Sequence, residues 1–505
     1  MTADLILHSG RFTTLDRSNP TATAVAITDG RFTAVGRDGE VMPLAGTSTG
    51  ILDLKGRRAL PGLIDNHLHI IRGGLNFNME LRWDGLRSLA DAMAMLKQQA
   101  AITPPPQWVR VVGGFTAHQF VEKRLPTIDE INAVAPDTPV FILHLYDRAL
   151  LNAAALRAVG YAKDTPDPPG GEIVRDGAGN PTGLLVARPN AGILYATLAK
   201  GPKLPFDYQL NSTRHFMREL NRLGVTGAID AGGGFQNYPE DYEVIRQLSE
   251  AGQLTIRLAY NLFTQKPKGE KADFLSWTRT SKYKQGDNYF RHNGAGEMLV
   301  FSAADFEDFR QPRPDMPPQM EGELEDAVRV LAENRWPWRL HATYDETISR
   351  ALDVFERVNR DIPLAGLNWF FDHADDLRPI DRPRGCAGWR HRGSAPHGLP
   401  GRVLRRALWR ESRRSNASLR QNLTQGHQGL GRHRCDARSI LQSVGFARLA
   451  HDRQNGRRAT ALSSAQLSRS RGGAAHVDRK RDVVLERGRQ EGAHRGRPVR
   501  RSDRP

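Results

Sequence analysis

The chain has 505 residues, of which 39% are hydrophobic, enough for a sizeable core and for one large barrel domain with a smaller one. The start, MTADLILHSG, lacks the basic and long apolar regions of a secretory signal, and no stretch reaches the about 18 apolar residues of a membrane span. We therefore expect a cytoplasmic protein with no membrane partner. The two cysteines, Cys386 and Cys435, both lie late in the chain, which excludes a disulfide framework and a CxxC metal pair.

The net charge of +16 is distributed unevenly. Residues 377–505 contain 30 Arg, 1 Lys and 9 Asp or Glu, a net of +22. Residues 1–376 therefore contain 41 basic and 47 acidic residues, a net of −6, which is typical of an ordinary enzyme. For the basic tail, binding to nucleic acid is the conventional interpretation.

The pattern of elements changes once along the first 376 residues. Residues 1–58 alternate apolar and polar positions, and Asp29-Gly30 is a hairpin signal, which predicts a small antiparallel β-layer. Further on, FMRELNRLG, GELEDAVRVLAENRWP and DETISRALDVFERVNRD have the pattern of helices, and VTGAID, WRLHAT and LNWFFDHAD that of strands. This alternation predicts βα units around a parallel sheet.

Four histidines fall where predicted strands meet loops. His67 and His69 end the run ALPGLIDNHLHI and share a strand face, because alternate strand residues point the same way. His341 closes WRLH, and His373 closes LNWFFDH about one βα unit later. Since strand ends converge at one mouth of a (β/α)8 barrel, the four imidazoles could form a divalent-metal site. Each histidine alone is more often satisfied by ordinary hydrogen bonds, so the prediction depends on the combination.

These features resemble the amidohydrolase superfamily, most closely its YtcJ-like branch, amidohydrolase family 3, whose hallmark is an N-terminal β-layer leading into PGxxDxHxH. PGLIDNHLH fits that pattern, and GGEIVRDGAGNPTGLL and HLYDRALLNAAAL also resemble the branch, so the likeness covers residues 4–376. The resemblance implies an α/β fold, with a distorted TIM barrel in residues 59–376 and a composite β-sandwich that begins with residues 1–58. It implies His67 and His69 on the first strand, His341 on the fifth and His373 on the sixth, and a catalytic aspartate on the eighth.

The activity that the resemblance implies is hydrolysis of a non-peptide C–N bond in a small-molecule amide, such as an N-acyl amine or a formamide. One or two divalent ions, with zinc expected, would lower the pKa of a coordinated water and polarise the carbonyl. Some relatives bridge two ions with a carboxylated lysine or a glutamate, and Glu297 in NGAGEMLVF is a candidate; a loop carboxylate facing solvent is the alternative. Asp65 either orients a neighbouring histidine or caps the turn.

The tail from Leu377 onward does not resemble the family, and its arginine excess is also what a GC-rich gene gives when read out of frame. When His433–Gly445 is back-translated with chosen synonymous codons and the frame is shifted to start at the last two bases of the Arg432 codon, it reads GTDATRVASYNPWV, which resembles the eighth-strand segment with the catalytic aspartate. We infer a frameshift near Leu377–Arg384. The barrel would then keep only strands one to six, residues 377–505 would be disordered, and the chain would be inactive. A nucleic-acid-binding protein acting through the tail is the less favoured alternative, and assembly into a homo-oligomer stays open.

Overall fold

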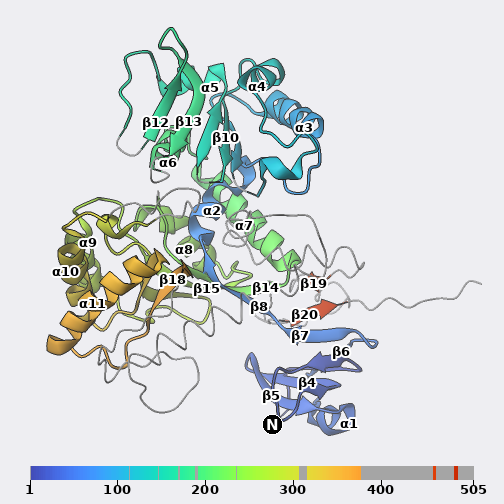
Figure 1. The fold of residues 1–505 in the computed structure, drawn as a ribbon. Coiled ribbons are helices and arrows are strands. Elements are labelled where there is room, and N and C mark those ends of the chain that lie inside the picture. The colour runs from blue at the N-terminus through green and yellow to red at the C-terminus, as the bar shows by residue number, and fades with distance from the viewer. Residues whose placement is uncertain are drawn as a thin grey trace, which may run out of the picture. The chain divides into compact units, whose positions relative to one another are not determined.

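The computed structural model describes residues 2–376 except 113, 146, 169–170, 188–191, 235 and 306–315, and in the tail it describes residues 459–461 and 483–486. The chain divides into two units, which Figure 1 shows as ribbons. The first comprises Met1–Leu63, Leu220–Thr226 and Arg448–Pro505, and the second comprises Ile64–Glu219 and Gly227–Ala447.

The first unit contains two sheets, with strand orders β5-β4-β1-β6 and β19-β20-β7-β2-β3. Antiparallel pairing, as predicted, joins β1 to β4 and β4 to β5, but β6 is parallel to β1 and β7 is parallel to β2. The layer is mixed because long connections bring β6 and β7 back alongside the earlier strands in the same direction. The elements are β1 (Leu5–His8), β2 (Arg11–Thr13), β3 (Thr21–Ala22), β4 (Ala24–Thr28), β5 (Arg31–Gly36), α1 (Asp38–Val41), η1 (Met42–Leu44), β6 (Gly50–Asp53), β7 (Arg58–Pro61), β19 (Ala459–Ala461) and β20 (Val483–Glu486).

Two of these strands belong to the tail. β20 pairs antiparallel with β7 and with β19, so it extends the second sheet of the β-layer. For these two strands the structure differs from the expected disorder, because VVLE is a short apolar run that can hydrogen-bond to an available strand edge. The rest of residues 377–505, and with it the inferred frameshift, lies outside the described residues.

The second unit is built on a six-stranded sheet with the order β18-β17-β16-β15-β14-β8. Strands β14 to β18 pair in parallel. The strands are β8 (Leu63–Leu68), β14 (Val225–Asp230), β15 (Arg257–Leu262), β16 (Phe290–Ala295), β17 (Trp338–Tyr344) and β18 (Trp369–Asp376). This order confirms the predicted α/β class, an incomplete (β/α)8 barrel, in which β8, β17 and β18 are the first, fifth and sixth strands.

Helices connect the strands of this sheet. The helical patterns predicted at residues 322–337 and 345–361 correspond to α10 and α11. None of the helices in the described ranges combines the length and apolar character that crossing a membrane requires. The helical elements are α2 (Ile70–Asn76), η2 (Phe77–Met79), α7 (Phe206–Arg222), η4 (Glu240–Tyr242), α8 (Glu243–Glu250), α9 (Glu270–Thr280), η5 (Phe301–Ala303), α10 (Met320–Glu333) and α11 (Asp345–Asp361).

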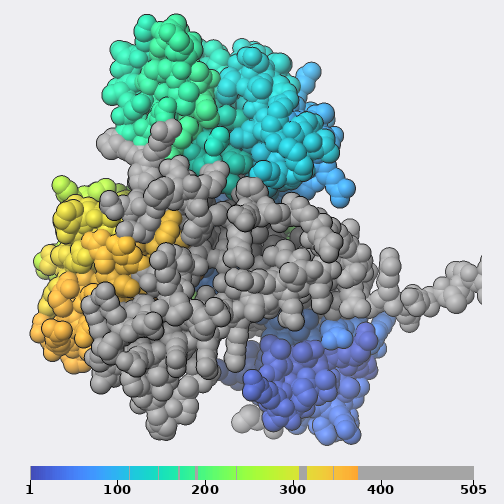
Figure 2. Space-filling model, in the orientation of Figure 1, coloured from blue at the N-terminus to red at the C-terminus, as the bar shows by residue number. Residues whose placement is uncertain are grey.

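An insert between η2 and α7 forms a sheet of its own, which the sequence patterns did not predict. Its strand order is β12-β13-β11-β10-β9. In Figure 2 the insert gathers into one compact lobe, coloured from light blue to green. Its elements are α3 (Leu89–Ile102), β9 (Val109–Val112), η3 (Ala117–Gln119), α4 (Ile128–Val134), β10 (Val140–His144), β11 (Arg148–Leu151), α5 (Ala153–Val159), β12 (Gly171–Arg175), β13 (Pro181–Ala187) and α6 (Gly192–Ala199).

Asn152, in the segment HLYDRALLNAAAL, joins three elements of the insert. Its buried side chain accepts hydrogen bonds from the backbone N–H groups of Val140 and Ala155, at 2.9 Å each. Its amide nitrogen donates to the carbonyls of Ala135 at 2.7 Å and Thr138 at 2.9 Å. One side chain therefore caps α5, anchors the start of β10 and closes the loop after α4.

We expect Asn152→Ala to lower the free energy of unfolding by about 2–4 kcal/mol, because it leaves several buried backbone groups without a hydrogen-bond partner. Urea unfolding followed by tryptophan fluorescence measures the loss. The matched control is Asn132→Ala, which removes a single hydrogen bond, from the N–H of Ala153 at 2.9 Å. Equal losses in the two variants would contradict the central role of Asn152.

Candidate metal centre

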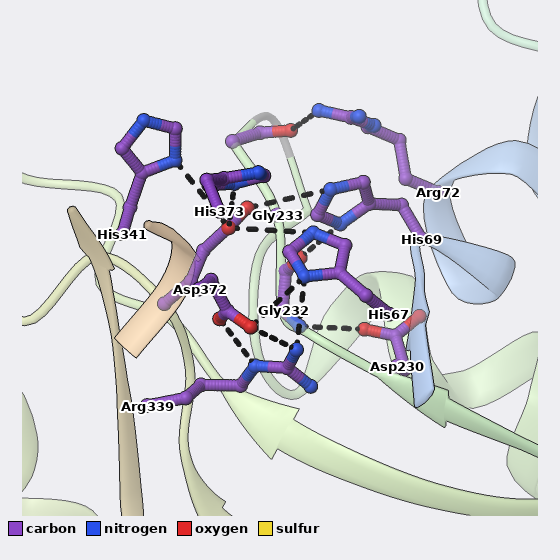
Figure 3. Close-up of polar contacts among 12 residues, drawn as sticks. His67, His69, Arg72, Asp230, Gly232, Gly233, Arg339, His341, Asp372 and His373 are labelled. Atoms are coloured by element: carbon purple, nitrogen blue, oxygen red, sulfur yellow. Dashed lines mark hydrogen bonds and ion pairs between the residues drawn. The ribbon is translucent and has the colours of Figure 1, made fainter. Parts of the chain in front are cut away.

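Three of the four predicted histidines lie in strands of the six-stranded sheet, whereas His69, expected on the first strand, lies just beyond it because β8 ends at Leu68. His67 lies in β8, and His69 follows it at the start of α2. His341 lies in β17 and His373 in β18. Figure 3 shows the imidazoles converging on one place, although they are far apart in sequence.

Glu297 lies at the centre of this group and is 10% exposed, which excludes the solvent-facing alternative. Its Oε2 atom is 3.4 Å from Nε2 of His67, 3.5 Å from Nδ1 of His341 and 3.3 Å from Nε2 of His373. Its Oε1 atom is 3.4 Å from Nε2 of His69. These side chains form two triads that share Glu297. One triad is His67, His69 and Glu297, and the other is Glu297, His341 and His373. In each triad the possible ligand atoms lie no more than 4.8 Å from one another.

These distances suit a metal site. Ligands about 2.0–2.1 Å from a tetrahedral zinc ion lie about 3.3–3.4 Å from one another, whereas hydrogen bonds to nitrogen have a mode of about 2.9–3.0 Å. The distances from the carboxylate oxygens of Glu297 to the nitrogens of the four imidazoles fall between 3.3 and 3.5 Å. The donor set of imidazole nitrogens and carboxylate oxygens is also the one that zinc accepts.

Burial and neighbouring groups shift the pKa values of His69 and Glu297. Burial, helped by the charge of Arg72, lowers the pKa of His69 to about 3, so its imidazole is neutral at pH 7. Burial raises the pKa of Glu297, but hydrogen bonds to His341 and His373 and the charge of His67 outweigh it and hold the pKa well below its usual range. A neutral imidazole and an ionised carboxylate are the forms that bind metals.

The backbone at His373 is unusual. Its φ of +70° lies in the left-handed region, which non-glycine residues rarely adopt. The pairing of β17 with β18 is also irregular here, with a register shift between Ala342 and Tyr344. Such conformations cost on the order of 1–3 kcal/mol and cluster at functional sites.

Asp65 contacts the backbone next to the site. Its Oδ1 atom accepts a hydrogen bond from the N–H of His67 at 3.0 Å, and both residues lie within β8 rather than in a turn. Orientation of an imidazole by Asp65 stays a prediction. Three residues that the sequence analysis did not name lie behind the histidines: Arg339, Asp372 and Asp305.

We expect Glu297→Gln to weaken Zn²⁺ binding by more than about 100-fold, beyond the 10–100-fold typical for partners outside the ligand shell. The reason is that a neutral amide replaces the one ionised group shared by both triads. Competition with a chromophoric chelator measures the affinity. Glu270→Gln is the matched control, because Glu270 is also buried but accepts its hydrogen bond from the N–H of Phe301. Similar losses in both variants would contradict a ligand role for Glu297.

Comparison with known proteins agrees with this geometry. Residues 50–388 match the model of the amidohydrolase family. The chain is 30% identical over 257 residues to N-substituted formamide deformylase of Arthrobacter pascens, covering 50% of this chain and 46% of that protein. It is 31% identical over 224 residues to the putative amidohydrolase YtcJ of Bacillus subtilis (strain 168), covering 44% and 41%. The chain thus spans about half the length of these relatives.

A solved structure supports the fold. An uncharacterized metal-dependent hydrolase from Pyrococcus furiosus superposes with a TM-score of 0.50 at 17% identity, and the match covers 70% of each chain. The family match spans most of this chain and includes all four histidines and Glu297. The chain belongs to the amidohydrolase family.

Proposed function

We propose that this chain is built as a metal-dependent amidohydrolase that cleaves a non-peptide C–N bond in a small amide. The main support is the set of four histidines around buried Glu297, at the separations of ligands that share an ion, in a member of the amidohydrolase family. Zinc held there would polarise the substrate carbonyl and lower the pKa of a coordinated water.

Glu297 is the proposed bridge between two ions. It belongs to both triads: its Oε1 atom faces His69, and its Oε2 atom faces His67 of the same triad as well as His341 and His373 of the other. The proposed substrate class is an N-acyl or N-formyl amine. This choice of substrate class rests on the similarity to N-substituted formamide deformylase, which is 30% identical to this chain over 50% of its length.

The chain also needs a group that takes the proton from water and delivers it to the leaving nitrogen. The carboxylates of Glu297, Asp372 and Asp305 contact the imidazole rings, and each is already engaged. Glu297 is surrounded by imidazoles, Asp372 pairs with Arg339, and Asp305 accepts backbone N–H groups of β17. We therefore propose that the proton carrier is the eighth-strand aspartate and that a frameshift in the tail removed it.

We expect this chain to hydrolyse N-formyl and N-acyl amines about 10²–10⁴-fold more slowly than a version whose reading frame is restored near codon 380, since acid–base groups typically contribute that much. Steady-state assays on a panel of both amine classes, with and without a chelator, compare the two.

The control is the restored chain with the aspartate of its GTDAT segment replaced by asparagine. Its turnover should fall to the level of the present chain. Equal turnover by the present and restored chains would contradict both the frameshift and the role of the aspartate.

A further inference from the structure

A buried ion pair lies directly behind His67. Arg339 donates from Nε to Oδ2 of Asp372 at 2.6 Å and from Nη2 to Oδ1 at 2.5 Å. The two side chains are 1% and 6% exposed. They come from adjacent strands, β17 and β18, and each is close in sequence to a histidine of the metal centre: Arg339 to His341 and Asp372 to His373.

The pair faces one nitrogen of His67, and the metal centre faces the other. Nδ1 of His67 is 3.2 Å from Oδ1 of Asp372 and 2.9 Å from Nη2 of Arg339. Nε2 points to Oε2 of Glu297 at 3.4 Å. Arg339 also donates from Nη1 to the carbonyl of Asn66 at 3.0 Å, so the pair contacts both the ring and the adjoining backbone of β8. Figure 3 shows Arg339 and Asp372 on the side of His67 away from His69.

The chemistry at Nδ1 provides a partner for either tautomer. Without a proton, Nδ1 can accept from the guanidinium of Arg339, which only donates. With a proton, Nδ1 can donate to the carboxylate of Asp372, which only accepts. A metal at Nε2 requires the second form, because the proton must then reside on Nδ1. Resting on the function proposed above, we propose that Asp372, held by Arg339, is a positioning residue that fixes the ring and tautomer of His67 for metal binding.

In two other histidines of the centre, as in His67, one ring nitrogen faces Glu297 and the other faces an oxygen acceptor. Nδ1 of His69 contacts the carbonyl oxygen of Gly232 while Nε2 faces Glu297. Nε2 of His341 lies 3.5 Å from Oδ1 of Asp305 while Nδ1 faces Glu297. At each of these rings an oxygen acceptor lies on the nitrogen that points away from Glu297. Acceptors of this kind orient metal-binding histidines and raise their basicity.

A contribution to folding stability does not by itself explain why Arg339 and Asp372 are buried as an ion pair. A buried ion pair often contributes no more to stability than well-packed apolar residues of similar volume, because both charges lose their hydration. A fixed acceptor beside a metal ligand has a direct use, because its loss typically weakens metal binding about 10–100-fold.

The test is a double-mutant cycle on the full chain, with Zn²⁺ affinity measured by chelator competition. We expect Asp372→Asn to weaken binding about 10–100-fold in the otherwise unchanged chain. In the His67→Ala background the same substitution should change affinity by less than about twofold, because the residue through which Asp372 acts is gone. In the His69→Ala background the full loss should persist.

A loss of equal size in the His67→Ala background would overturn the inference, since it would indicate a general structural effect. Asp372→Asn leaves the charge of Arg339 uncompensated, so the cycle is repeated with Arg339→Met/Asp372→Asn, which removes both charges. The loss should remain in this variant, and recovery of normal affinity would also overturn the inference. If the unmodified chain bound no Zn²⁺, the proposed function would fail together with the inference. If the unmodified chain bound Zn²⁺ but the losses from Asp372→Asn and His67→Ala were additive, the inference would be overturned and the proposed function would stand.

Discussion

The buried carboxylate of Glu297 is the point at which side chains from both edges of the six-stranded sheet meet. A buried charge is costly unless it is paired and hydrogen-bonded. Here imidazoles from three strands surround it, and they include strands at both edges of the six-stranded sheet, β8 and β18. The rings of His67 and His373 lie 5.0 Å apart, although their strands are at opposite ends of the strand order. The sheet must therefore curl until its edges approach each other, and the polar contacts of Glu297, Arg339 and Asp372 span that gap.

Sequence patterns could predict the strands and the histidines but not the groups behind them. His341 and His373 each close an apolar run, which places them at strand ends without knowledge of the fold. Arg339 and Asp372 carry no comparable signal, since an isolated charge in a strand is usually on a solvated face. Their contact depends on the register of β17 with β18, in which His341 lies opposite Asp372. Register of this kind is set by three-dimensional packing, so the local pattern did not reveal the pair.

The insert and the tail show two further limits of the sequence patterns. The insert connects the first two barrel strands with a five-stranded sheet of its own, because segments attached to a barrel's loops can fold around a separate core. Its Asn152 was visible as part of a family-like segment, but its four hydrogen bonds depend on contacts that only the fold defines. In the tail, composition predicted disorder on average, whereas the short run VVLE pairs with β7.

The proposed metal ligands and the proposed proton carrier belong to different parts of this chain. All the proposed ligands come from strands one, five and six and from the segment after strand four, so they are encoded before residue 377. That part is mildly acidic and matches the family, whereas the proposed proton carrier would come from the strongly basic tail. The proposed change of reading frame after the sixth strand would leave every proposed ligand in place, and it would remove strands seven and eight together with the group that moves the proton. We therefore expect zinc affinity and the rate of hydrolysis to be separable in this chain, because under the proposed function the first depends on Glu297 and the histidines and the second also requires a residue beyond them.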